Sequence, residues 1–433
     1  MLQSSTLTDN RQPTTDNYLA HRNMPIIIIG GGIHGISIAM RLLRDKPNAA
    51  QHIAIVDRHP KPLTEWRHKT VRQGMTFLRS PAVHHITPDA LGIVDYAKEH
   101  NRSDELAPPY SQPSTALFWD YCNDALAVSG LQIPPMGHNI YYQFEVAKLR
   151  WDKGSGKYPF RLISTNNEGF RSRCVILAIG SDDCAYMPPE FTDWQRRYPD
   201  KIVHASQFSV NTTQNIGDGE KIVIVGGGLT AGTLAKSLSE QGHHVVLIAR
   251  KQLKTEQFDF PPIWLGPKTL GEFASETDFQ RRYQIIQENR GEGSITPDVM
   301  ETLKPSNNVK IYSETYIRDI VCTRGLQVTT TRGIISDVSR IILATGYRFN
   351  LRRYGFLREL FQQYPIPLVC GLPKLDANLQ FYPIENLFGS GTVAQLQIGP
   401  AAGNIAGANL AYQRFREKLI AHLPHTIHPY VDI

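Results

Sequence analysis

The feature that most constrains this chain is a strand, glycine turn, helix and second strand between residues 24 and 57. Isoleucines fill positions 26–29, as expected of a parallel strand that is buried on both faces. The run breaks into Gly30-Gly31-Gly32-Ile33-His34-Gly35, which satisfies G-x-G-x-x-G, and a second apolar run ends on Asp57. This order predicts a Rossmann-like dinucleotide-binding unit in an α/β fold.

Each residue of the motif has a distinct predicted task. Gly30 allows the tight turn, Gly32 lets a pyrophosphate approach the backbone, and Gly35 lets helix and strand pack closely. The amides at the helix start face the phosphates, and Asp57 can accept hydrogen bonds from a ribose. A glycine turn in an unrelated α/β domain is the alternative.

A second unit of the same type begins at residue 222. Its strand runs into a G-x-G-x-x-A turn marked by Gly226, Gly228 and Ala231. The next strand ends near Arg250 and Lys251, where a ribose-binding unit would carry an acid. A guanidinium can bind a 2′-phosphate, which favours NADPH over NADH. The alternative, that Arg250 and Lys251 are a solvated pair beside an NADH site, stays open.

The two units predict a flavin domain that is interrupted by an inserted nucleotide domain. Apolar runs at 175–180 and 341–347 are both predicted to return to the flavin sheet, and the long 252–307 connection could face the nicotinamide or thicken its domain. The predicted division is a disordered tail (1–23), the first segment of the FAD domain (24–208), the NADP domain (209–335), the second segment of the FAD domain (336–421) and a C-terminal tail (422–433).

The last predicted flavin contacts lie near the C-terminus. A glycine-containing element includes Gly391, and Pro400 and Asn404 stand at the start of a long helix. A helix start with small residues can approach the flavin pyrimidine and stabilise negative charge when the ring is reduced.

Composition excludes several classes. The net charge of +6 is spread along 433 residues, so nucleic-acid binding is not expected. Five separated cysteines without C-x-x-C indicate a reducing, cytoplasmic location and disfavour a dithiol-disulfide reductase. No membrane span is predicted, because four glycines interrupt the most apolar stretch. Metal binding by His422, His425 and His428 is possible but lacks a thiolate, so no metal site is predicted.

Catalytic residues cannot be assigned from the sequence. The irregular segment 58–121 is of the kind that folds over a flavin ring. Weak candidates there are Arg79, Ser80, His84 and His85. An ordinary surface-and-core excursion with hydrogen-bonded histidines is the alternative.

Four segments in this order resemble class B flavin monooxygenases, and most of all the N-hydroxylating lysine and ornithine monooxygenases of siderophore synthesis. They are 30–35, 204–208 (His-Ala-Ser-Gln-Phe), 226–231 and 343–347 (Leu-Ala-Thr-Gly-Tyr). The resemblance covers roughly residues 24–420. It implies FAD in the first unit, NADPH in the second, and a C4a-hydroperoxyflavin that oxygenates an amine.

Three functions stay open at this stage. The first is an NADPH-using, FAD-dependent monooxygenase acting with O2 on a small soft nucleophile, by N-hydroxylation if that nucleophile is an amine. The second is an NADPH-dependent flavin reductase or dehydrogenase that passes electrons to a quinone or a carrier protein. The third is a non-enzymatic, FAD-bound redox sensor. The motifs identify the cofactor chemistry and not the acceptor.

Overall fold

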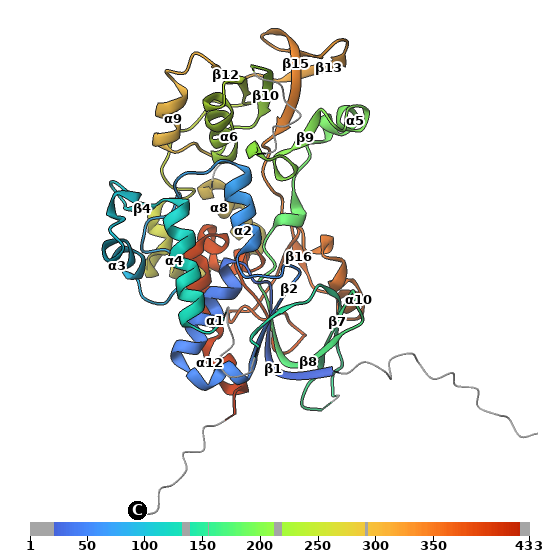
Figure 1. Cartoon of the computed structure of the whole chain (residues 1–433). Helices are drawn as coiled ribbons and strands as arrows, with labels where there is room; N and C mark the ends of the chain where they lie inside the picture. The colour runs from blue at the N-terminus through green and yellow to red at the C-terminus, as the bar shows by residue number, and fades with distance from the viewer. Residues whose placement is uncertain (1–20, 132–138, 155, 212–218, 291–292, 425–433) are drawn as a thin grey trace, which may run out of the picture.

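Two β-sheets, one in each of two lobes, organise the structure, a computed structural model that describes residues 21–131, 139–154, 156–211, 219–290 and 293–424 (Figure 1). Each lobe contains the predicted strand, glycine turn, helix and parallel strand. The prediction of two Rossmann-like units in an α/β fold is confirmed.

The first sheet has the order β5-β2-β1-β8-β7-β6, with β18 pairing β8. Its centre is parallel, and Ile26 of β1 lies opposite Ile53 of β2 and Cys174 of β8. Isoleucines 26–28 are fully buried, which explains the unbroken apolar run. The strands are β1 (His21–Ile29), β2 (Ile53–Asp57), β5 (Tyr141–Gln143), β6 (Val146–Trp151), β7 (Phe160–Ser164), β8 (Gly169–Leu177) and β18 (Leu387–Gly389).

The second sheet has the order β12-β11-β10-β15-β14-β13, with β9 pairing β15. Its β10, β11 and β12 are parallel, and β13, β14 and β15 form an antiparallel extension. The strands are β9 (Ile202–His204), β10 (Lys221–Val225), β11 (His244–Ile248), β12 (Val309–Tyr312), β13 (Ile317–Cys322), β14 (Leu326–Thr330) and β15 (Gly333–Leu343).

Helices cover the sheets and connect the lobes. In the first lobe α1 packs against α12, and in the second α6 packs against α9 (Figure 1). The helices are α1 (Ile33–Asp45), α2 (Thr64–Arg72), α3 (Gly92–Glu99), α4 (Thr115–Val128), α5 (Pro189–Arg197), α6 (Leu229–Glu240), α7 (Pro267–Ser275), α8 (Phe279–Arg290), α9 (Pro297–Leu303), α10 (Arg358–Gln363), α11 (Gln395–Ile398) and α12 (Ile405–His422). None of these described helices is long and apolar enough to cross a membrane.

Three predictions about the chain path need correction. Residues 341–343 form the end of β15 in the second sheet, so the predicted return of 341–347 to the flavin sheet is wrong. The second sheet also reaches from residue 202 to residue 343, beyond the predicted 209–335. Residues 21–23 belong to β1 rather than to a tail. Residues 341–343 were assigned to the wrong sheet because a buried parallel strand has the same apolar pattern in either sheet.

The long connection within the second lobe packs on the first lobe. Its α7 and α8 contact α11, and α8 contacts the 3₁₀ turn Pro400–Gly403. Apolar side chains from this connection join the core of the first lobe, namely Phe260, Trp264, Phe273 and Ile286. Buried Arg282 donates to the carbonyl of Leu396 (3.0 Å) and to Oε1 of Gln397 (2.8 Å). Residues 256–290, which we call the insert, therefore cover the first lobe.

Candidate functional site

At the three motif positions of the first glycine turn, 30, 32 and 35, the fold requires a glycine at two and not at the third. A Cβ on Gly30, whose φ is +114°, would lie 2.3 Å from the carbonyl oxygen of Ala178, and one on Gly35 would lie 1.9 Å from that of Gly30. Gly32 has φ −78° and ψ −171°, which any residue adopts, and its Cβ would meet nothing within 4 Å. The missing side chain at Gly32 therefore leaves open space above the start of α1.

That open space suits an anion. Gly32 is the N-cap of α1, no side chain caps the helix, and its first turn carries no acidic residue. The positive end of the helix dipole and its unpaired amides are thus available to a phosphate group. The Asp57 carboxylate beside it accepts hydrogen bonds from the amides of Gly31 (2.6 Å) and His59 (2.8 Å), which fixes it at the turn. These residues fit the pyrophosphate and ribose of a dinucleotide such as FAD.

The second turn repeats this geometry. A Cβ on Gly226 would lie 2.3 Å from the carbonyl oxygen of Ala344, just as Gly30 lies against Ala178. Gly228 has φ −101° and ψ −178°, and its Cβ would make only an ordinary contact, 3.7 Å from Cα of Gly293. Ala231 is fully buried, as the close-packing position requires. The first turn of α6 also lacks an acidic residue.

Arg250 is exposed after β11. Its Nη1 lies 3.8 Å from Oε1 of Glu190 on α5, and both side chains are about half exposed. An exposed pair of this kind contributes little to stability, so the guanidinium can move to a phosphate at small cost. Lys251 follows directly and is exposed as well. The role of both residues in binding a 2′-phosphate stays a prediction.

Asn404 joins three regions of the molecule at the start of α12. Its carbonyl accepts from Nε2 of His34 (3.1 Å), its Oδ1 accepts from Nη1 of Arg290 (3.0 Å), and its Nδ2 donates to Oδ2 of Asp259 (3.3 Å). The Asn404 side chain does not cap α12. The helix start therefore keeps unpaired amides, as expected of a site for the flavin pyrimidine.

His34, the fifth residue of the glycine motif, was not predicted as a site residue. Its Nδ1 accepts from the Ser390 hydroxyl (3.0 Å) while Nε2 donates to Asn404. Burial lowers the pKa of His34 to about 4, so the imidazole is neutral at physiological pH. A Cβ on Gly391, whose φ is +75°, would lie 3.6 Å from the His34 ring. The predicted cofactor residue Gly391 therefore packs beside the first glycine turn, and Pro400 is buried one turn before Asn404.

Two adjoining cavities lie between the first glycine turn and the insert. The larger, which we call the ring cavity, has a volume of about 240 Å³. The smaller, the side chamber, has a volume of about 90 Å³. Both are lined by Ser80, Asp259 and Asn404. The ring cavity also has His34, Trp66 and Arg290 in its wall. Because it lies between His34 and the start of α12, the ring cavity fits the redox ring of a flavin.

The four weak catalytic candidates separate into two groups. Arg79, Ser80 and His84 all line the side chamber. His85 lies in the core instead, where its Nδ1 is 3.0 Å from Oγ1 of Thr87 and Nε2 is 3.3 Å from the carbonyl of Ala90. Burial lowers the pKa of His85 to about 4. His85 therefore has the alternative, structural role that its segment allowed.

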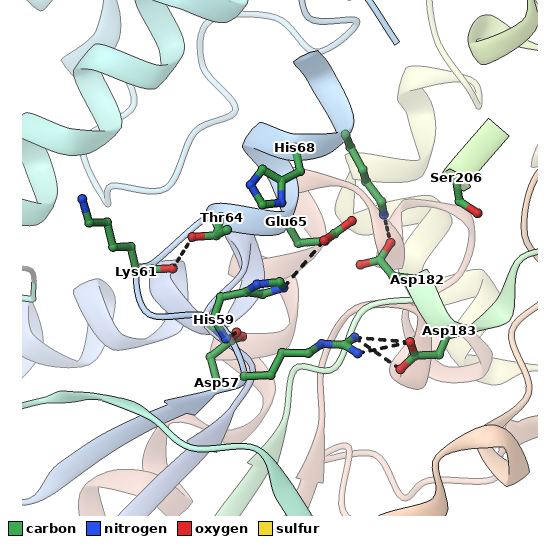
Figure 2. A network of polar contacts seen from close by, with 12 residues as sticks. Asp57, His59, Lys61, Thr64, Glu65, His68, Asp182, Asp183 and Ser206 are labelled. Carbon is green, nitrogen blue, oxygen red and sulfur yellow. Dashed lines mark hydrogen bonds and ion pairs between the residues drawn. The ribbon is translucent and has the colours of Figure 1, made fainter. Parts of the chain in front are cut away.

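A polar network fixes α2 near the end of β2 (Figure 2). His59 lies 3.6 Å from Glu65, Arg58 pairs with Asp183 at 3.3 Å, and Lys69 pairs with Asp182. Burial lowers the pKa of Lys69 to about 8. Asp182 and Asp183 follow β8, so the network ties α2 to the segment that leaves the first sheet.

The segment after β9 and the segment after β15 meet beside α2. His204 Nε2 donates to the carbonyl of Gly346 (3.2 Å), and its Nδ1 accepts from the amide (3.1 Å) and hydroxyl (2.8 Å) of Ser206. Ser206, which lies at the edge of the network in Figure 2, accepts from Nη1 of Arg72 at 2.8 Å through its carbonyl. The two segments with the family resemblance, 204–208 and 343–347, therefore form one junction.

The turn after α2 touches the second lobe. Gly74 has φ +65°, and a Cβ there would lie 2.4 Å from the Ser237 hydroxyl on α6. Oε1 of Gln73 accepts from the hydroxyl of Thr230 at 3.5 Å. Because Thr230 belongs to the second glycine turn, the turn after α2 joins the first lobe to that glycine turn.

No metal site is found among the residues that the structure describes, which include His422 but not His425 or His428. All five cysteines are free, and three of them are buried. None lines either cavity. The redox chemistry of this site therefore has no protein thiol beside it.

The chain resembles known proteins in sequence and in fold. The sequence profile of the family described as "Pyridine nucleotide-disulphide oxidoreductase" matches residues 24–260. No curated protein sequence matches. The ornithine hydroxylase PvdA from Pseudomonas aeruginosa has a similar structure, with 17% identity, a TM-score of 0.71, and coverage of 93% of this chain and 100% of that one.

Two further solved structures are similar. L-lysine 6-monooxygenase from Pseudomonas syringae has 18% identity and a TM-score of 0.69, covering 93% of this chain and 100% of that one. The bacillithiol disulfide reductase Bdr (YpdA) from Bacillus cereus has 14% identity and a TM-score of 0.56, with the same two coverages. At these identities the likeness concerns the fold.

Proposed function

The chain belongs to the pyridine nucleotide-disulphide oxidoreductase family, as an oxidoreductase that uses FAD and a pyridine nucleotide, and we propose that it is an NADPH-dependent monooxygenase acting on an amine. The proposed reaction joins NADPH, a proton, O2 and R–NH2 to give NADP⁺, water and R–NH–OH. One oxygen atom enters the product and the other leaves as water.

The observation that carries this proposal is the pair of adjoining cavities without a thiol. A disulfide reductase of this family needs a sulfur acceptor close to the flavin, but no cysteine lines the ring cavity or the side chamber. An oxygenase needs a substrate space that joins the flavin site and is shielded from water. The side chamber adjoins the ring cavity through Ser80, Asp259 and Asn404.

Different groups of residues would bind FAD, NADPH and the substrate. The start of α1 and Gly32 would hold the FAD pyrophosphate, and the start of α12 would face the pyrimidine edge of the ring. When bound, FAD supplies hydride acceptance from the nicotinamide and the activation of O2. Gly228 and Arg250 would hold the NADPH phosphates. The insert would form one wall of the side chamber, with Phe258, Phe260 and Leu265 toward the substrate space.

His84 would act as a hydrogen-bond acceptor in this scheme. It lines the side chamber, and burial lowers the pKa of its imidazole, so the ring is neutral at physiological pH. An amine must lose its proton before its nitrogen lone pair can attack oxygen. A neutral imidazole at the wall can accept an N–H hydrogen bond from the uncharged amine and so favour that form. Arg79 and Ser80 would position the insert and the substrate.

The names of similar structures favour an amine as the acceptor. The proteins with TM-scores of 0.71 and 0.69 are named as an ornithine hydroxylase and a lysine 6-monooxygenase. For the division of the chain, we propose an inserted NADPH unit of about 202–343, flanked by the two segments of the FAD unit. A cytoplasmic location is included in the same proposal, because all five cysteines are unpaired.

Isotope tracing tests the function. The protein with bound FAD is mixed with NADPH, ¹⁸O2 and a panel of primary amines, and NADPH oxidation, H2O2 release and hydroxylamine formation are measured together. We expect an amine-dependent product that carries one ¹⁸O atom. Rapid NADPH oxidation with a quinone or a disulfide in the absence of O2, without ¹⁸O in any amine, would instead establish a reductase. The Gly32→Val variant serves as a control without flavin.

A further inference from the structure

The side chamber has walls of two kinds. Its hydrocarbon surface comes from both lobes and consists of Pro81, Phe258, Phe260, Pro262, Leu265 and Ala406. Four of these six belong to the insert. Tyr110 packs edge-on against Phe258, with ring centroids 4.9 Å apart, and supports this wall from the first lobe. Apolar walls of this composition favour a hydrocarbon group.

The guanidinium in the described chamber wall is already fully occupied. Arg79 Nε donates to the carbonyl of Gln257 (2.7 Å), and its Nη1 donates to Oδ1 of Asp259 (2.5 Å) and the carbonyl of Ser294 (3.5 Å). Its Nη2 donates to the carbonyl of Glu256 (2.7 Å) and the hydroxyl of Ser294 (2.5 Å). These bonds use all five N–H donors of an arginine. A substrate carboxylate would therefore find no donor on Arg79.

The hydrogen-bond acceptor at the chamber boundary is a carboxylate. Asp259 stands where the chamber meets the ring cavity, and it is the one carboxylate in the described lining of either cavity. Each of its oxygens receives one hydrogen bond, from Arg79 and from Asn404. A carboxylate accepts up to about four, so Asp259 can also receive N–H donors from a ligand. The polar end of a ligand would thus lie at this boundary.

We propose that the substrate is an amine with a hydrocarbon body and no carboxylate, that is, an alkylamine or arylalkylamine. Its nitrogen lies at Ser80, Asp259 and Asn404, and its body fills the side chamber. This inference rests on the proposed function for the reaction, and on the chamber alone for the substrate class. Amino acids such as ornithine and lysine do not fit, because burying their carboxylate beside an occupied Arg79 and the charged Asp259 is unfavourable.

Binding to the oxidised protein with bound FAD tests the substrate class without any turnover. Calorimetry with butylamine, pentylamine and hexylamine should show an affinity that rises about fourfold with each added methylene until the chamber is full. The matched ligand 6-aminohexanoate has the same amine and a carboxylate, and it should bind at least tenfold more weakly than hexylamine. Tighter binding of 6-aminohexanoate, L-lysine or L-ornithine than of hexylamine would overturn the inference.

Two variants test the location. Leu265→Arg places a cation in the chamber wall and should reverse the preference toward 6-aminohexanoate. Ile263→Arg is the matched control, because Ile263 lies in the same turn but is 65% exposed and outside the lining. The control should leave both affinities unchanged. If Leu265→Arg does not fold, Phe260→Leu enlarges the chamber and should weaken hexylamine about tenfold. Unchanged ligand affinities in a folded Leu265→Arg or Phe260→Leu variant would contradict the assignment.

The two proposals fail in different ways. Binding that depends on chain length but never gives ¹⁸O transfer would reject the monooxygenase and keep the ligand class. Oxygen transfer to lysine or ornithine in preference to alkylamines would keep the monooxygenase and reject the proposed ligand class.

Discussion

Replacing Gly32 by valine should remove FAD and leave the folded apoprotein. The glycine has backbone angles that valine can adopt, and a Cβ there meets no atom within 4 Å. Steric fit within the fold therefore does not require a glycine at this position. Only a ligand that occupies the space above α1 requires the missing side chain.

The expected loss can be worked out from the contacts that the side chain would prevent. A phosphate at the helix start gains charge-assisted hydrogen bonds worth about 1.5–3 kcal/mol and a helix-dipole contribution of about 0.3–1 kcal/mol. Their sum, roughly 2–4 kcal/mol, corresponds to a 30- to 900-fold weaker Kd for FAD. Valine is a poor N-cap residue, so the apoprotein should lose only about 1 kcal/mol of stability.

The assay is a fluorescence titration of the deflavinated protein with FAD, together with thermal unfolding of the apoprotein. Gly271→Ala is the matched control: this glycine is exposed on α7 with open space around it, so FAD binding should not change. Gly35→Ala should abolish folding itself, because its Cβ would lie 1.9 Å from a carbonyl oxygen. A Gly32→Val protein with a Kd for FAD within threefold of wild type would refute the reasoning.

Three further predictions concern nucleotide choice, pH and lobe geometry. Arg250→Ala should raise KM for NADPH about ten- to a hundredfold in stopped-flow flavin reduction and leave KM for NADH unchanged. The control Glu190→Gln removes only the carboxylate that lies 3.8 Å from Arg250, and it should not weaken NADPH binding. Equal wild-type affinities for both nucleotides would contradict this role of Arg250. The pKa of His85 is about 4 in the folded protein and an ordinary 6.5 in the unfolded chain. The free energy of unfolding that its neutral state contributes is therefore complete above pH 6.5 and falls by about 3 kcal/mol as the pH drops to 4. Urea unfolding of His85→Gln should lack this pH dependence, and identical pH profiles of wild type and variant would contradict the prediction. Gly74→Ala should slow flavin reduction by NADPH, because its Cβ would press on Ser237 at 2.4 Å. Adding Ser237→Gly should restore some of the rate. An unchanged reduction rate in Gly74→Ala would show that this contact does not set the lobe spacing.

The sequence sufficed for the elements that local rules govern. Each glycine turn is defined by a strand before it and a helix after it, so the structure has both turns where the motifs lie. Asn404 was found because a helix start with small residues has a recognisable pattern, and it does lie at the ring cavity. The strand at 341–343 was assigned to the wrong sheet, because its pattern reports burial and not the neighbouring strand.

The cavity walls could not be found in this way. Asp259 and Arg290 meet Asn404 over separations of 145 and 114 residues, and no motif links them. The sequence showed only that the 252–307 connection is long and could face the nicotinamide or thicken its domain. His34 could have been noticed as a titratable residue inside a phosphate-binding motif, but its partners Ser390 and Asn404 depend on the tertiary fold.

Four of the six hydrocarbon residues of the side chamber belong to the insert, whose two ends join the nucleotide lobe, so a lobe movement that displaces the insert would open the chamber. Any nucleotide that favours a different lobe position must lower the affinity of the chamber for its ligand. Thermodynamic reciprocity then requires the chamber ligand to lower nucleotide affinity by the same factor. If NADPH favours such a movement, substrate and NADPH weaken each other's binding even where they do not touch.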